Sequence, residues 1–143
     1  MVVRVKVRIN LKVEVIGTRK SLDLVVLANG GAESPKPCIV VNREIAELLS
    51  LWPPPRAEMY VAEEASVISE VYLIPNSVVL ELLDEKGNTL SSIEADLAIQ
   101  EGLKEPLITD ITIDELGIQV ISFSKGLWRH RNDPPDMVRS SAK

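Results

Sequence analysis

The first fifteen residues alternate between apolar and polar positions. Every second residue from Val3 to Val15 is valine, isoleucine or leucine, and the positions between them are charged or polar. A repeat of two residues is typical of a β-strand with one buried and one solvated face. The segment is therefore predicted to form β structure.

Short apolar runs separated by turn residues continue along the chain. Strands are predicted over 22–28, 38–41, 77–83, 90–100, 107–108 and 118–123. A hairpin is predicted between 57 and 75, with the acidic segment Glu63-Glu64-Ala65-Ser66 at its tip. Pro75 separates this hairpin from the strand at 77–83. The pattern predicts a mainly β protein.

Two short helices interrupt the strands. Asn42 is predicted to cap a helix over 43–50, whose inner face carries Ile45, Leu48 and Leu49. A shorter helix is predicted over 112–116 and is closed by Gly117.

Composition places the chain among globular proteins. The 143 residues are 45% hydrophobic and 26% charged, which fits one domain with an ordinary core. No apolar run approaches the length of a membrane span, and the N-terminus does not resemble a secretory signal. Cys38 is the single cysteine, so no internal disulfide can form. We therefore expect a cytoplasmic protein that does not bind membranes.

The net charge of −5 is unevenly distributed. Residues 1–20 and 125–143 are basic, whereas 21–124 are acidic. An acidic body argues against nucleic-acid binding, which requires neutralised phosphates. The basic ends suit contacts between subunits or with an acidic partner, but solvated strand faces and a loose tail are the favoured explanation. We expect a domain over 1–124 and an extended or partly disordered basic tail over 125–143, which contains Pro134-Pro135.

Three segments resemble the retroviral-type aspartic proteases. These segments are 24–28 followed by Asn29-Gly30-Gly31-Ala32, then 39–49, then Leu107-Ile108-Thr109-Asp110 followed by 116–118. In that family a strand leads into an Asp-Thr-Gly-Ala turn, a strand and helix follow, and a second hydrophobic motif opens a short helix. The resemblance covers roughly residues 11–124. It implies a closed six-stranded acid-protease-like barrel, paired as a homodimer with the Asn29 segments facing each other. It also implies that Glu63-Glu64-Ala65-Ser66 is the tip of a flap.

The chain is also similar to a group of archaeal relatives of these proteases. The matching segments are Leu51-Trp52-Pro53-Pro54, Gly126-Leu127-Trp128-Arg129 and Asp133-Pro134-Pro135. This similarity supports the fold and implies no activity.

The departures from the family pattern concern catalysis. Asn29 stands at the position of the catalytic aspartate, and an amide has no titratable carboxyl group to act as acid or base. Gly30 replaces the threonine that joins the two catalytic loops, and Thr109 stands where glycine is usual. The flap tip has none of the family's glycines. We predict no aspartic protease activity, while Asn29-Gly30 as an ordinary tight turn stays open as an alternative.

Other candidate sites have ordinary explanations. We expect a buried structural Cys38 and a solvated His130, and one residue of each type gives too few ligands for zinc. Asp110, Asp114 and Glu115 lack the spacing of a calcium loop, and the two aspartates are expected at the start of the short helix. Trp52 and Trp128 are expected to pack against the fold, with a role as recognition anchors as the alternative. No metal or cofactor is predicted.

Three functions stay open on the sequence. The first is a non-catalytic module that holds an extended peptide or protein between two subunits by strand addition. The second is a structural or assembly subunit. The third is a hydrolase that uses carboxylates other than the missing aspartate.

Overall fold

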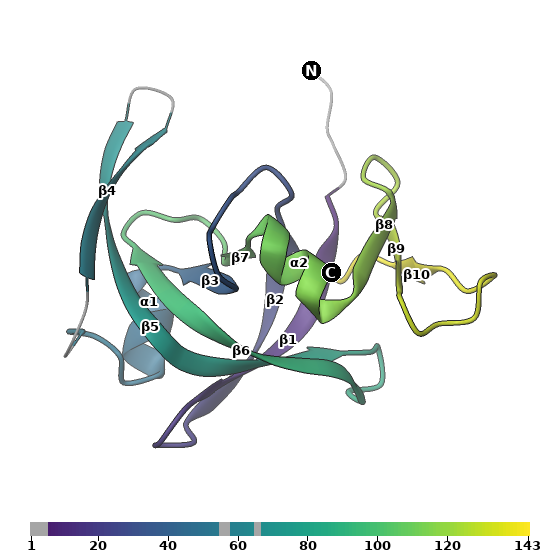
Figure 1. Ribbon diagram of the computed structural model, residues 1–143, viewed down its shortest axis with the longest axis horizontal. Helices are drawn as coiled ribbons and strands as arrows, with labels where there is room; N and C mark the ends of the chain where they lie inside the picture. Colours follow the sequence, from purple (N-terminus) through teal and green to yellow (C-terminus); the bar gives the residue numbers. More distant parts are fainter. Residues whose placement is uncertain (1–5, 55–57, 65–66) are drawn as a thin grey trace.

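The computed structural model describes residues 6–54, 58–64 and 67–143, and it is mainly β (Figure 1). One sheet has seven strands and a second sheet has three. The larger sheet contains β1 (Arg8–Val15), β2 (Ser21–Ala28), β3 (Cys38–Val41), β4 (Glu58–Glu64), β5 (Val67–Leu83), β6 (Thr89–Gln100) and β7 (Leu107–Ile108). The smaller sheet contains β8 (Ile118–Ser122), β9 (Leu127–His130) and β10 (Arg139–Ser140). The helices are α1 (Arg43–Leu48) and α2 (Asp110–Leu116).

The larger sheet has the order β1-β2-β7-β3-β6-β5-β4, and β1 also pairs with β5. The β2–β7 and β3–β6 pairs are parallel, and the other pairs are antiparallel. Strand β1 therefore has a partner on each edge. Strand β4 lies at the end of the order, and Figure 1 shows it with the first half of β5 as an arm that projects from the body.

The alternation at the N-terminus is confirmed for the described part of that segment. Ile9, Leu11, Val13 and Val15 of β1 are buried, and the polar residues between them are half-buried. Residues 1–5 lie outside the described residues. The rest of the core comes mainly from aliphatic side chains of the larger sheet, including Val26, Ile39, Val41, Val78, Leu80, Leu82, Leu97, Ile99 and Ile108.

The predicted break at Pro75 is a bulge inside one strand. The β5–β6 register shifts between Ile74 and Val78, because proline has no N–H to continue the ladder. The next residue, Asn76, has a φ of 46°, and its N–H donates to Asp96 Oδ1 at 2.8 Å. The long strand therefore bends without ending.

The two helices largely follow the prediction. Asn42 caps α1, since its Oδ1 accepts the Ile45 N–H at 2.9 Å. Leu49 is buried, but Leu48 is exposed, so the prediction that Leu48 faces inward is wrong. Helix α2 begins at Asp110, earlier than predicted, and ends at Gly117 in the left-handed conformation.

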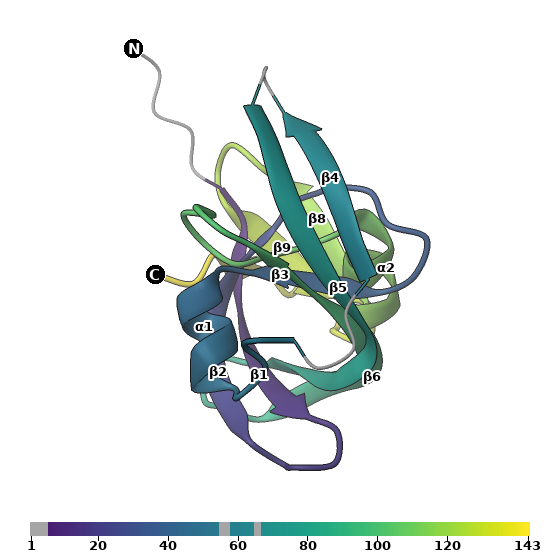
Figure 2. The ribbon, with the colours of Figure 1, turned by 90° about the vertical axis from the view of Figure 1, so that its left-hand side faces the viewer.

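The C-terminal segment is folded, which corrects the prediction of an extended or partly disordered tail. Residues 127–130 and 139–140 form β9 and β10, and the Ala142 N–H donates to the Arg8 carbonyl at 2.8 Å. The tail is therefore held to β1 of the larger sheet. Figure 2 shows α1 on the near side of the molecule, while the smaller sheet lies behind it. None of the helices in the described part of the chain could span a bilayer.

Candidate functional site

Residues 29–32, here called the Asn29 loop, form a tight turn after β2. The Ala32 N–H donates to the Asn29 carbonyl at 3.1 Å and closes the turn. The Asn29 side chain also accepts within the loop, because its Oδ1 receives the Gly31 N–H at 3.1 Å. The turn predicted at Asn29-Gly30 is therefore present.

The parallel pairing of β2 with β7 brings the second motif beside the Asn29 loop. Ala28 pairs with Ile108, and the Asn29 N–H donates to the Ile108 carbonyl at 3.1 Å. On the other side of the turn, the Asp110 N–H donates to the Ala32 carbonyl at 2.8 Å. Two segments that the sequence connects only through a family resemblance thus share backbone hydrogen bonds.

Three hydroxyl groups, here called the hydroxyl cluster, hold the start of α2 to the chain that follows the loop. Thr109 Oγ1 lies 2.7 Å from Ser34 Oγ and 2.8 Å from Thr112 Oγ1. Thr112 Oγ1 accepts the Cys38 N–H at 2.8 Å and donates to the Cys38 carbonyl at 3.1 Å. The cluster was not predicted, although two threonines three residues apart at the start of a helix were a usable signal. It carries no charge.

An open apolar hollow lies against the Asn29 loop. Its volume is about 550 Å³, and its lining consists of Lys6, Val7, Leu27, Ala28, Asn29, Gly30, Gly31 and Phe123. Phe123 follows β8 and is 54% exposed. Among the residues that the structure describes, the lining contains one charged group, Lys6, and no carboxylate. The hollow therefore offers apolar surface and amides, and it lacks a carboxylate for acid–base catalysis.

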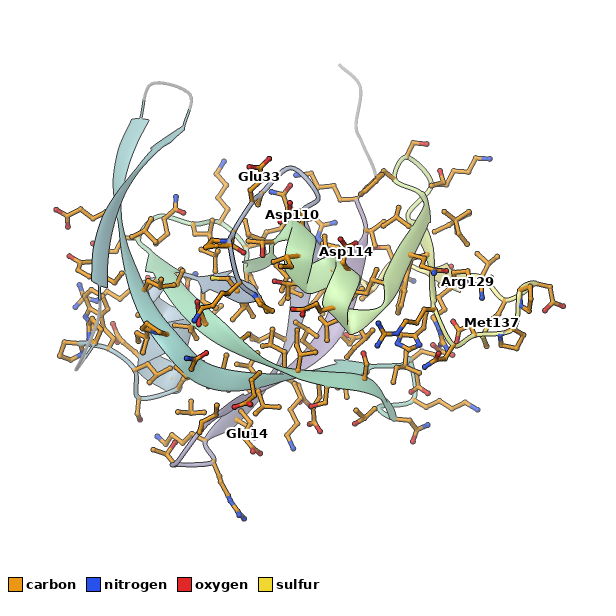
Figure 3. All side chains as sticks on the ribbon, in the orientation of Figure 1. Glu14, Glu33, Asp110, Asp114, Arg129 and Met137 are labelled. Carbon is orange, nitrogen blue, oxygen red and sulfur yellow. The ribbon has the colours of Figure 1, made fainter. Side chains whose placement is uncertain are left out.

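Asp110 lies at the start of α2, as predicted, whereas Asp114 lies in its last turn, so the prediction for Asp114 is wrong. The Oδ1 of Asp110 accepts the Ile111 N–H at 2.7 Å in the first turn of α2. A negative charge is favourable at this end of a helix because of the helix dipole. Figure 3 shows Asp110 and Asp114 on α2, with Glu33 close to Asp110 in this view. In the described ranges, histidine, cysteine and carboxylate side chains form no group of three or more suited to a metal ion.

The predicted flap is a hairpin. Strands β4 and β5 pair antiparallel, with Glu63 opposite Ile68 and Glu64 opposite Val67. The other two residues of the predicted tip, Ala65 and Ser66, lie outside the described residues.

Cys38 is buried, as predicted, and unsuited to thiol chemistry. Burial, and after it the nearby Asp96 carboxylate, raise the pKa of the Cys38 thiol to about 12. Asp96 is itself buried and lies 3.3 Å from Lys36 Nζ. A cavity of about 250 Å³ adjoins both residues. Asp96 Oδ1 forms an ion pair with Lys36 and accepts the backbone N–H of Asn76 at the bulge. We therefore assign Asp96 a structural role, which is to stabilise the bend of β5.

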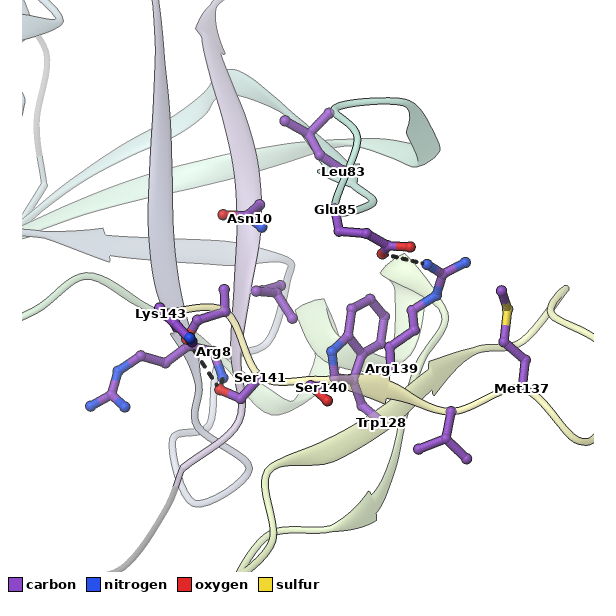
Figure 4. A pocket seen from close by; sticks show the side chains of 13 residues that line it. Arg8, Asn10, Leu83, Glu85, Trp128, Met137, Arg139, Ser140, Ser141 and Lys143 are labelled. Carbon is purple, nitrogen blue, oxygen red and sulfur yellow. Dashed lines mark hydrogen bonds and ion pairs between the residues drawn. The ribbon is translucent and has the colours of Figure 1, made fainter.

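A second polar group, here called the C-terminal corner, consists of Trp128, His130, Asp133 and Arg139. The Arg139 Nε and Nη2 atoms each donate to the Asp133 carboxylate at 2.8 Å, and both side chains are 8% exposed. Arg139 also reaches Glu85 at 2.9 Å, as Figure 4 shows. Its guanidinium lies 5.7 Å from the centre of the Trp128 ring. The hydrogen bond from Arg139, with the amide of His130, lowers the pKa of Asp133.

His130 is buried, so the prediction of a solvated histidine is wrong. Its Nδ1 accepts the Asn132 N–H at 3.2 Å, which leaves Nε2 to donate to the Leu116 carbonyl at 3.1 Å. Alternation along β9 places His130 and Trp128 on the same buried face. Both ring nitrogens have partners, so His130 serves packing.

The tryptophans pack against the fold, as predicted. Trp128 is buried, and Trp52 meets Tyr72 edge-on with ring centres 5.4 Å apart. The Trp128 Nε1 has no hydrogen-bond partner in the part of the chain that the structure describes.

Comparison with known proteins adds no assignment. No protein-family model matches the chain, and no curated protein matches it. The resemblance carried by the Asn29 loop and the second motif therefore stays a prediction.

Proposed function

We propose that the protein is a catalytically inactive aspartic-protease-like domain that dimerises and binds a peptide or protein segment. The observation that carries the proposal is the apolar hollow at the Asn29 loop, which is open to solvent and whose described lining residues include no carboxylate. Such a surface can bind apolar groups and cannot activate water with a pair of carboxylates.

The strand pairings favour the architecture that the resemblance implies. Six strands follow one another through β1, β2, β7, β3, β6 and β5, and the β5–β1 pairing joins the last to the first. A closed six-stranded acid-protease-like barrel accounts for this cycle of pairs. The contact of the Asn29 loop with the second motif is also what that architecture requires.

Exposed apolar side chains beside the hollow support a dimer. Phe123 borders the hollow, and Ile121 is exposed on the adjoining strand β8. Burial of large apolar groups between two copies removes them from water, which is the main favourable term in association. A symmetric pair places the two Asn29 loops against each other.

Strand β4 gives the proposed dimer a place for an extended ligand. It ends the strand order, and the described residues offer it no partner other than β5. An unpaired edge presents N–H and C=O groups to which a peptide can add as another strand.

Sedimentation of matched surface variants tests the dimer. We expect the wild-type protein to sediment as a dimer and Phe123→Ser to weaken it by roughly tenfold or more, since burying an aromatic side chain is worth over 1.4 kcal/mol. Val138→Ser is the control, because Val138 is also 54% exposed but does not line the hollow. A monomeric wild-type protein, or equal effects of the two variants, would overturn the dimeric part.

Binding and hydrolysis are tested on a panel of unstructured peptides. We expect wild-type protein to bind a subset of the panel, Phe123→Ser to bind it more weakly, and no peptide to be cut. A dimer that binds nothing favours the structural or assembly role. Cleavage that persists in the Asn29→Ala variant would favour the hydrolase with other carboxylates.

A further inference from the structure

We propose that Asn29-Gly30 is a self-modification site, at which the Asn29 side chain deamidates through a cyclic imide to give a mixture of aspartate and isoaspartate. The dipeptide lies in the lining of the hollow, with Gly30 exposed and Asn29 half-exposed. The modification rests on the loop itself. Its consequence for association, given below, rests on the proposed function.

The nucleophile of the reaction is the backbone nitrogen of Gly30. In the described part of the chain, this N–H donates no hydrogen bond, although its neighbours at 29, 31 and 32 all donate one. Glycine also has no side chain to hinder ring closure, and its backbone rotates more freely than that of any other residue.

The electrophile is the side-chain carbonyl carbon of Asn29. Its oxygen accepts the Gly31 N–H at 3.1 Å, so electron density is drawn away from this carbon. The same N–H stabilises the negative charge that develops on the oxygen during attack, as a backbone donor does for an acyl-transfer intermediate. The loop therefore presents nucleophile and activated carbonyl on adjacent residues.

The step is balanced without an oxidant or a metal. The Gly30 nitrogen forms a bond to Asn29 Cγ, the bond from Cγ to Nδ2 breaks, and Nδ2 leaves as ammonia with the proton that Gly30 loses. Water then adds to either carbonyl of the imide. One ring opening gives aspartate and the other gives isoaspartate.

The chain contains its own controls. The other asparagines are Asn10, Asn42, Asn76, Asn88 and Asn132, and none of them precedes glycine. Asn42 Oδ1 is engaged as the cap of α1, and the Asn88 side-chain amide donates to the Asp84 carboxylate at 3.2 Å. Asn29 is thus the position at which modification is expected first.

The product places a carboxylate in the lining of the hollow, which also contains Lys6. In the proposed dimer the two loops face each other, so two carboxylates meet near the symmetry axis. Like charges at short range repel, and the modified chains associate more weakly.

Peptide mass spectrometry of the intact protein, held in mildly alkaline buffer below its unfolding temperature, tests the modification. We expect conversion at Asn29 to exceed that at Asn76 and Asn88 by roughly tenfold or more, since only Asn29 precedes glycine. Gly30→Ala is the control. A Cβ at position 30 meets Phe123 at 3.8 Å, an ordinary contact, so this variant should fold and convert roughly tenfold more slowly. Conversion at Asn29 no faster than at Asn76 overturns the proposal.

A second comparison measures whether the folded loop reacts as readily as the same residues in an unfolded chain. A synthetic peptide spanning residues 24–36 should convert at a rate within roughly threefold of the native protein, if the folded loop is already suited to the reaction. Native protein that converts over about a hundredfold more slowly than the peptide also overturns the proposal.

Sedimentation of Asn29→Asp tests the consequence. We expect the dissociation constant of the dimer to rise by about tenfold at low salt. The rise should be smaller at high salt, because salt screens the repulsion. An unchanged dimer overturns the charge effect alone. A monomeric wild-type protein refutes the proposed dimer instead, and the mass spectra still decide the modification.

Discussion

The Asn29 loop and the C-terminal corner are both rich in polar groups, but they use them differently. In the corner, Arg139 and Asp133 are buried, charged and bonded to each other through two hydrogen bonds. In the loop, Asn29 is neutral, and it bonds only to backbone groups. The corner is closed over Trp128, whereas the loop borders an open apolar hollow.

The difference separates stability from recognition. Buried charges are tolerated only when they are paired, so the paired charges of the corner serve to bind the second sheet to the body. Neutral groups with exposed apolar neighbours cost little to leave open, and they suit the binding of a partner. We therefore expect substitutions in the corner to reduce stability and substitutions in the loop to alter association.

The largest effect is expected from Asp133→Asn. Removing the carboxylate leaves the buried guanidinium of Arg139 paired with the exposed Glu85, and should lower the free energy of unfolding by about 3 kcal/mol. Urea unfolding measures this loss. Glu85→Gln is the control, because Glu85 is 68% exposed and its ion pair should contribute about 0–1 kcal/mol. Equal losses in the two variants would contradict the assignment of the corner to stability.

The pH dependence of that loss sharpens the comparison. The pKa of Asp133 is lowered in the folded state, so its contribution is complete above the ordinary carboxyl pKa and is lost as the pH falls through the lowered value. The difference between wild type and Asp133→Asn should hold at pH 7, begin to shrink near pH ~4 and vanish at lower pH. Urea midpoints from pH 7 downward follow it. A difference that persists unchanged in acid would mean that the carboxylate charge is not its source.

The hydroxyl cluster should be the part of the loop region on which stability depends. Thr112→Val removes the acceptor of the buried Cys38 N–H and should lower the free energy of unfolding by about 1–3 kcal/mol. Thr18→Val makes the same change at an exposed hydrogen bond and should stay within about 0.5 kcal/mol of wild type. Thermal unfolding compares the two, and similar losses would show that the cluster has no special role.

Gly117 tests how closely α2 and the C-terminal corner are joined. An added Cβ would lie 2.9 Å from His130 Nε2, and the φ of 80° is itself strained for alanine. Gly87 has a φ of 86° with nothing near its Cβ position, so Gly87→Ala isolates the backbone strain. We expect Gly117→Ala to lose about 1 kcal/mol more than Gly87→Ala in urea unfolding, because a packed neighbour must move. Equal losses of stability in the two variants would mean that the His130 side chain moves aside without an energetic cost.

The smallest effect on stability is expected at the loop itself. Asn29→Ala removes one exposed hydrogen bond to Gly31 and should change the free energy of unfolding by about 0.5 kcal/mol or less. The same variant adds no charge to the hollow, so its dimer should match that of wild type in sedimentation. A loss as large as that of Asp133→Asn would contradict the separation of the two regions.

The local elements could be predicted because their signals are local. Alternation fixed the buried face of β1, Asn42 marked the start of α1, and Gly117 marked the end of α2. The single strand across Pro75 could not be predicted in the same way. Its continuity depends on Asp96, a distant residue that accepts the amide of Asn76.

The features of the candidate site also divide into those set by neighbouring residues and those set by contacts between distant segments. The Asn29-Gly30 turn follows from two adjacent residues whose backbone preferences suit a tight turn. Its position beside Ile108 follows from the parallel pairing of β2 with β7, and pairing between distant strands leaves no local pattern in a sequence. The hydroxyl cluster and the hollow also left no local pattern, since their residues come from segments far apart in the chain.

The C-terminal corner shows the physical reason most plainly. The alternation of Leu127-Trp128-Arg129-His130 was visible in the sequence, yet a short run among basic residues and prolines is also compatible with a solvated tail. Burial of Trp128 and His130 became favourable only where Arg139, Asp133 and Leu116 met them in space. Strand identity is thus set by neighbouring residues, whereas burial, ion pairing and the choice of open surface are set by which distant segments come together.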